Sequence, residues 1–170
     1  MSSVKAALVS SAAVDSSPCG ITGRVNRLLE SSMEPGTFVT FFFAALDPVT
    51  PRIDYVNAGH PSPLLLRQNG SLEKLEAGGV ILGILSDAAY EQGSVTLSAG
   101  DTLALFTDGV TEAEAPDKSL SDESRVETLP RREQGRSAAA VLERLVDDIR
   151  VFEDGIAACD DLTAIVMRIP

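Results

Sequence analysis

The chain has 170 residues, of which 44% are hydrophobic and 23% are charged, as in soluble globular proteins able to bury a core. Its 14 basic and 25 acidic side chains give a formal net charge of −11. Proteins that bind nucleic acids or anionic membranes need a basic surface, so this charge argues against both as partners. We expect a single domain over residues 1–170.

The N-terminal segment and the cysteines indicate a cytoplasmic protein. Apolar residues recur at helical spacing in residues 3–14, which favours a helix over a signal peptide. The apolar run FVTFFFAAL has nine residues, well short of the ~18 that a membrane span needs. Cys19 and Cys159 show neither CxxC spacing nor a disulfide framework, so we expect two reduced thiols.

The first half of the chain predicts two helices followed by strands. Ser, Pro and Gly separate a helix over 3–14 from a second over 20–32. Residues 36–48 are β-branched and aromatic, which predicts a buried strand. Residues 52–79 predict two or three more strands, with a turn at Asn57–His60 and a hairpin at Asn69-Gly70.

The second half predicts a hairpin, a helix and a final strand. Residues 90–109 have the pattern of a hairpin that turns at Ala99–Asp101. Ser137 is placed to cap a helix over 137–152, and residues 162–169 predict the last strand. This order is α+β with layered sheets and helices, and it lacks the βαβ alternation of doubly wound nucleotide-binding folds.

Acidic side chains stand at the ends of two predicted strands. Asp108 ends the strand over 102–107, while Asp160 and Asp161 precede the strand over 162–169. If these strands are antiparallel neighbours, the carboxylates meet at one sheet edge, where they repel unless a cation joins them. Oxygen ligands without nearby histidine or cysteine favour Mg²⁺ or Mn²⁺ over zinc. Spacing alone favours a plainer alternative, in which Asp-Gly is a turn and Asp-Asp a loop.

One class of phosphatase shares the strand-end aspartate but lacks support here. Haloacid-dehalogenase-type enzymes end their first strand in DxDG, and the first aspartate is the nucleophile. Phe106 occupies that position in this chain and cannot attack phosphorus. The parallel α/β pattern of those enzymes is also missing from the sequence.

Five blocks that follow one another along the chain resemble a known family. They are FVTFFFAALDP, YVNAGHPSPLLLR, GGVILGIL, GDTLALFTDGVTEA and DDLTAIVMRI. Together they resemble the sporulation stage II protein E/RsbU branch of the metal-dependent PPM serine/threonine phosphatases, over roughly residues 4–169. The resemblance implies an αββα sandwich of two antiparallel sheets flanked by helices. It also implies hydrolysis of phosphoserine or phosphothreonine by a water that Mn²⁺ or Mg²⁺ activates.

The resemblance assigns roles to residues of this sequence. Asp108 and Asp160 match metal-binding aspartates that also serve catalysis, and Asp161 is expected, as part of the metal site, to orient Asp160 or a metal-bound water. Gly109 lets the chain turn beside the ion. His60, in NAGH, is expected to contact the substrate phosphate or pass a proton to the leaving serine oxygen, although a structural role is the common alternative for a lone histidine.

Supporting roles and partners also follow from the resemblance. Asn57 and Gly59 are expected to shape the turn that carries NAGH. The implied substrate is a phosphorylated regulatory protein, of the anti-sigma-factor-antagonist (STAS-like) type, in a partner-switching pathway.

The sequence departs from the family pattern at its start. Family members carry a Gly-Asp-Val-x-Gly-type block before the first helix, and its aspartate bridges two metals. No such block occurs here, so we expect a domain truncated at its N-terminus with a weakened metal site. An alternative function is a catalytically impaired pseudo-phosphatase that binds a protein partner. A scaffold domain with chance Asp-Gly turns would require all five blocks to be coincidental.

Overall fold

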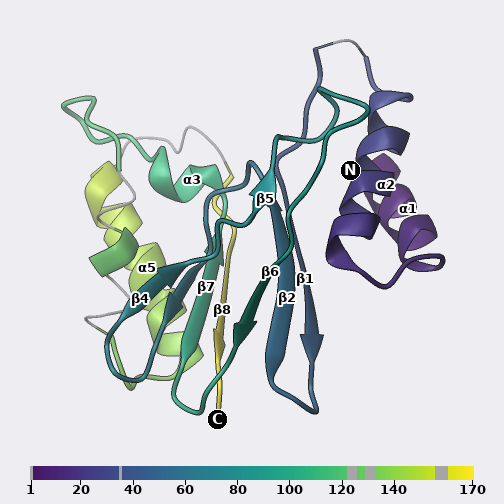
Figure 1. Cartoon of the computed structure of the whole chain (residues 1–170). Helices are drawn as coiled ribbons and strands as arrows, with labels where there is room; N and C mark the ends of the chain where they lie inside the picture. Colours follow the sequence, from purple (N-terminus) through teal and green to yellow (C-terminus); the bar gives the residue numbers. More distant parts are fainter. Residues whose placement is uncertain (1, 35, 122–125, 129–132, 156–160) are drawn as a thin grey trace. The chain divides into compact units, whose positions relative to one another are not determined.

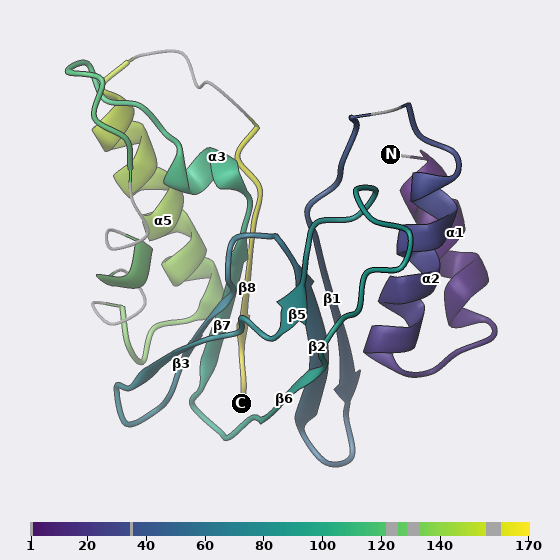
Figure 2. The same cartoon turned by 45° about the horizontal axis from the view of Figure 1, so that its top comes forward.

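Two mainly antiparallel sheets, each of four strands, and several helices make up the structure, a computed structural model (Figures 1 and 2). It describes residues 2–34, 36–121, 126–128, 133–155 and 161–170. The chain divides into two compact units, Met1–His60 with Leu75–Thr96, and Pro61–Lys74 with Leu97–Pro170. No helix within these described ranges has the length and apolar character that crossing a bilayer requires.

The first unit packs two helices against a sheet. Its elements are α1 (Ser2–Ala12), α2 (Pro18–Glu30), β1 (Phe41–Asp47), β2 (Arg52–Ala58), β5 (Gly78–Gly79) and β6 (Gly93–Thr96). The Ser17 hydroxyl accepts a hydrogen bond from the Gly20 amide, and Pro18 follows at the first helical turn, so α2 starts where capping chemistry favours it. Its buried Ile21, Val25 and Leu29 form the apolar stripe that packs against the sheet.

The prediction of a buried strand over 36–48 is wrong in burial and in length. Strand β1 starts at Phe41, and its residues are half-buried or exposed. It lies at the edge of its sheet and pairs with β2, in an antiparallel register that sets Phe41 opposite Ala58. Phe41 and Phe43 pack beside the α1–α2 core on one face, whereas Phe42 stacks on Tyr55 of β2 with ring centroids 5.7 Å apart. The aromatic run therefore covers both faces of an edge strand.

The second unit places one long helix on a sheet. Its elements are β3 (Leu64–Leu66), β4 (Leu72–Lys74), β7 (Thr102–Phe106), α3 (Asp108–Thr111), α5 (Ala138–Glu153) and β8 (Ala164–Arg168), with strand order β4-β3-β7-β8. The predicted Asn69-Gly70 hairpin is confirmed between β3 and β4, and Gly70 has the positive φ of 87° that such a turn needs. The predicted Ser137 cap is also confirmed, because its hydroxyl accepts from the Ala140 amide at 3.2 Å.

The predicted hairpin over 90–109 is wrong. Strand β6 pairs antiparallel with β2 in the first sheet, whereas β7 pairs with β3 and β8 in the second. The chain does turn at Gly100, whose φ is 88°, but it passes from one sheet to the other there. Turn residues between two strands predict a bend, yet they do not determine which strands pair.

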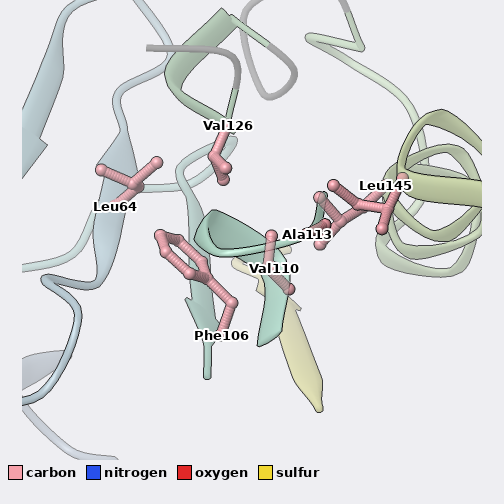
Figure 3. Close-up of a cluster of buried hydrophobic side chains, with 7 residues drawn as sticks. Leu64, Phe106, Val110, Ala113, Val126 and Leu145 are labelled. Atoms are coloured by element: carbon pink, nitrogen blue, oxygen red, sulfur yellow. The ribbon is translucent and has the colours of Figure 1, made fainter. Parts of the chain in front are cut away.

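The core of the second unit surrounds the end of β7. Phe106 from β7, Val110 and Ala113 from the α3 region, Leu64 from β3 and Leu145 from α5 converge in one buried cluster (Figure 3). Val126 joins it with 2% of its surface exposed, so part of the polar 114–135 segment is anchored in the core. Phe106 and Val110 thus fix the chain on both sides of Asp108.

Candidate metal centre

Asp108 lies where strand β7 gives way to helix α3. Phe106 before it and Val110 after it are 3% and 0% exposed, so the local backbone is held by the core. Asp108 itself is half-buried, and its Oδ1 accepts a hydrogen bond from the Gly109 amide at 3.1 Å. Its carbonyl accepts from the Glu112 amide and the Thr111 hydroxyl, which closes the single turn of α3. The carboxylate is therefore presented at a fixed strand end.

The segment that carries Asp161 runs beside this strand end. Strands β7 and β8 are antiparallel neighbours, which meets the condition on which the carboxylates were expected to share a sheet edge, and their register sets Phe106 opposite Ala164. The Thr107 amide extends the ladder by donating to the Thr163 carbonyl at 3.0 Å. The main chain of residues 107–109 thus meets that of 161–163, a contact between segments 54 residues apart that we call the strand-end junction.

Gly109 permits the close approach within this junction. It is buried, and a Cβ built on it would lie 2.7 Å from the Asp161 carbonyl oxygen and 3.4 Å from the Leu162 nitrogen. Its φ is not in the left-handed region, so the demand for glycine comes from space rather than from backbone conformation.

Replacing Gly109 by alanine is expected to destabilise the protein by about 1–3 kcal/mol, because the new methyl group overpacks the junction. The free energy of unfolding in urea is the measurement. Gly23→Ala is the matched control, since its Cβ would meet only Arg27 Nη1 at 3.7 Å inside α2. Equal stability of Gly109→Ala and the unaltered protein would contradict the close approach.

The carboxylate groups at the junction are of the ligand type that a hard divalent cation prefers. Asp108 is half-buried and Asp161 exposed, and both offer carboxylate oxygens, which Mg²⁺ and Mn²⁺ prefer. Within the part of the chain that the structure describes, no group of three or more His, Cys, Asp or Glu side chains is gathered as a complete site. The predicted ligand Asp160 lies outside the described residues.

The predicted turn at His60 lies in the first unit. The Asn57 side chain spans it: Oδ1 accepts from the His60 amide at 2.8 Å, and Nδ2 donates to the His60 carbonyl at 2.9 Å. Gly59 has a φ of 72°, and a Cβ there would collide with Ile81 Cγ2. The imidazole Nδ1 of His60 lies 3.3 Å from the Thr40 hydroxyl. Asn57 therefore fixes the backbone of His60, and Thr40, from the segment before β1, contacts its ring.

Sequence reasoning gave two residues less weight than their contacts in the structure warrant. Thr107 stands beside Asp108, and its hydroxyl bonds to the 161–163 segment. The Asp101 side chain is 2% exposed and pairs with Arg67 at 2.9 Å. A threonine directly before Asp-Gly at a strand end was the available signal for the first, whereas the second pair is separated by 34 positions and has no local signature.

Comparison with known proteins gives relatives over the whole chain. Residues 1–170 match the family model described as Stage II sporulation protein E (SpoIIE). The phosphoserine phosphatase RsbU of Bacillus subtilis is 30% identical over 99% of this chain, which spans 50% of RsbU. The chain thus spans about half the length of that relative.

Solved structures show the fold. The SiaA PP2C domain of Pseudomonas aeruginosa superposes with a TM-score of 0.86 at 19% identity, covering 98% of this chain and 68% of that one. The manganese-presoaked phosphatase domain of SpoIIE from Bacillus subtilis gives 0.65 at 17% identity, covering 98% and 71%. The predicted α+β, PPM-like fold is confirmed, and the chain belongs to the Stage II sporulation protein E (SpoIIE) family.

Proposed function

We propose that this chain is a protein serine/threonine phosphatase domain that hydrolyses phosphoserine or phosphothreonine with the help of Mn²⁺ or Mg²⁺. The observation that carries the proposal is the strand-end junction, where Asp108 and the segment of Asp161 lie side by side. Membership of the SpoIIE family supports it, as does the activity in the name of the relative RsbU.

The carboxylates of the strand-end junction would hold the ion, and the bound ion would promote hydrolysis of the phosphate ester. A bound Mn²⁺ or Mg²⁺ neutralises phosphoryl oxygens and makes water a better nucleophile. Asp108 would bind the ion from the end of β7, with Asp161 and the predicted ligand Asp160 contributing from the segment before β8. The fixed backbone on both sides of Asp108 keeps its carboxylate oriented, which such electrostatic catalysis requires.

His60 has a separate proposed role in contacting the substrate phosphate or in passing a proton to the leaving oxygen. Support comes from its fixed setting in the first unit, where Asn57 and Thr40 hold its backbone and ring. Replacing His60 by glutamine, which keeps polarity but loses the imidazole, is expected to lower phosphate release while leaving Mn²⁺ affinity unchanged. Calorimetric titration with Mn²⁺ and a phosphate-release assay separate the two effects, and unaltered release would contradict the role.

The proposed substrate is a phosphorylated regulatory protein of the anti-sigma-factor-antagonist, STAS-like type, in the cytoplasm. The name of the relative, a phosphoserine phosphatase, supports the phosphoserine chemistry.

Phosphate release from a serine-phosphorylated STAS-domain protein tests the proposal. We expect release with Mn²⁺ or Mg²⁺, loss of release with EDTA, and recovery when the ion is restored. A tyrosine-phosphorylated peptide is the control and is expected to stay intact. Mn²⁺ binding without release would favour a protein-binding module instead of an enzyme, and neither binding nor release would contradict the assigned site.

A further inference from the structure

We propose that Thr107 is a positioning residue that assembles the metal site before the ion arrives. The inference rests on the proposed function, because it assigns to Thr107 the task of holding the Asp108 and Asp161 segments together. It gives the threonine of the Thr-Asp-Gly sequence a role of its own, distinct from binding the ion.

The hydroxyl of Thr107 bonds across the junction rather than within its own helix. Thr107 is the N-cap of α3, a position at which threonine usually accepts a hydrogen bond from an amide of the first turn. No such cap bond is made. Instead, Oγ1 accepts from the Thr163 amide at 3.1 Å and donates to the Asp161 carbonyl at 3.2 Å, with the Thr163 carbonyl at 3.4 Å as the alternative acceptor. Helix capping therefore does not account for the threonine.

The backbone explains why a hydroxyl is needed here. In an antiparallel ladder the Thr163 amide would donate to the Thr107 carbonyl, which faces it across the pair. That carbonyl already accepts from the Val110 amide, because the chain has turned into α3. The Thr107 hydroxyl takes over as acceptor for Thr163, and so extends the β7–β8 pairing past the point where the backbone alone can continue it.

Electrostatics gives this contact a function. Asp108 and Asp161 carry like charges on the two segments that Thr107 joins, so the segments repel before a cation binds. Thr107 is half-buried and Thr163 exposed, and water can compete for the exposed hydrogen bonds between them, so the contact contributes little to global stability. Its main effect is to hold the two carboxylate-bearing segments close together. Without it, binding of the ion would have to supply the free energy that orders these segments.

Three variants of the full 170-residue chain test the inference. Thr107→Val keeps the shape and removes the hydroxyl, Thr107→Ser keeps the hydroxyl, and Thr163→Val removes a hydroxyl from the same junction while leaving its backbone groups in place. Mn²⁺ affinity is measured by calorimetry, and urea unfolding confirms that each variant is folded. We expect Thr107→Val to bind Mn²⁺ about tenfold more weakly or worse, the usual effect of losing a group that orients metal ligands. Thr107→Ser and Thr163→Val are expected to bind as the unaltered chain does.

Amide hydrogen exchange tests the contact without a metal, and its first measurement uses the unaltered chain. The Thr163 amide is expected to exchange slowly although its residue is exposed, and to exchange faster in Thr107→Val. Fast exchange of the Thr163 amide in the unaltered chain would overturn the inference. So would a Thr107→Val variant that binds Mn²⁺ as tightly as the unaltered chain, or a Thr107→Ser variant that binds Mn²⁺ as weakly as Thr107→Val. If the unaltered chain binds no Mn²⁺, both this inference and the proposed function are overturned, whereas the other outcomes overturn this inference alone.

Discussion

Replacing Asp108 by asparagine is expected to lower phosphate release from a serine-phosphorylated protein on the order of 100-fold or more, the usual loss when a group that stabilises transition-state charge is removed. Asparagine has nearly the same shape, so the Phe106 and Val110 anchors stay buried and the fold is kept. What disappears is the negative charge at the end of β7. Mn²⁺ affinity, measured by calorimetry, is expected to fall together with activity.

The control must separate the lost ligand from the changed net charge. Asp147→Asn alters the charge of the same unit by the same amount, at an exposed position on α5. It is expected to keep both activity and Mn²⁺ affinity. A parallel decline in the two variants would mean that the acidic surface as a whole, rather than Asp108, attracts the ion.

The second large effect concerns stability and the pair of Asp101 and Arg67. The Asp101 side chain is 2% exposed, and its carboxylate accepts hydrogen bonds from the Ser98 and Gln68 amides at 3.0 Å and from Arg67 Nη1 at 2.9 Å. Burial by itself raises the pKa of Asp101. The hydrogen bonds from the two amides and the charge of the guanidinium lower it by more than burial raises it, so the pKa lies below its usual 3.8. The ionised form is therefore favoured in the folded protein.

Replacing Asp101 by asparagine is expected to destabilise the protein by about 3 kcal/mol near neutral pH, because it leaves the Arg67 charge partly buried without its inner partner. The sign of the pH dependence follows from the lowered pKa of Asp101. Its stabilisation is fully present above the unfolded value near 3.8 and disappears as the pH falls through the lower folded value. Urea unfolding over a pH series is the measurement, and the variant is expected to lose less stability on acidification than the unaltered chain.

Glu73 offers a matched control, since it bonds the same arginine from a more exposed position. Its carboxylate lies 2.7 Å from Arg67 Nε, and its side chain is 46% exposed. Glu73→Gln is expected to cost less than about 1 kcal/mol, as exposed ion pairs do. Equal losses of unfolding free energy in the Glu73 and Asp101 variants would show that burial does not make the Asp101–Arg67 pair stronger than the Glu73–Arg67 pair.

The sequence predicted elements where local chemistry determines them. The helix that begins after Ser137 was found because capping and apolar spacing act within a few residues, and the structure has the same cap. The aromatic run at 41–43 was misplaced in the core, because its composition cannot distinguish an edge strand from a central one. The hairpin over 90–109 failed for a related reason: the partners of β6 and β7 lie tens of residues away.

The candidate site shows the same division. The two strand ends allowed Asp108 to meet the Asp161 segment on the condition that the strands pair antiparallel, and the β7–β8 register meets that condition. Thr107 and Thr163 suggest local hydrogen-bonding groups in the sequence, but the partners of the Thr107 hydroxyl were not predicted, because they depend on the Thr107 carbonyl already accepting from the Val110 amide. A side chain that takes the place of a backbone carbonyl already hydrogen-bonded to another amide leaves no periodic pattern in the sequence.

The division of the chain into two units also limits how the protein could be dissected. The unit that carries Asp108 takes β3 and β4 from residues 61–74, a segment inserted between two stretches of the other unit. A fragment that starts after Thr96 would lack β3, the partner of β7 on the side opposite β8. Folding must therefore join segments that are remote along the chain, which raises the contact order and slows the search for native pairings. No single cleavage of the polypeptide yields either unit whole and free of segments of the other.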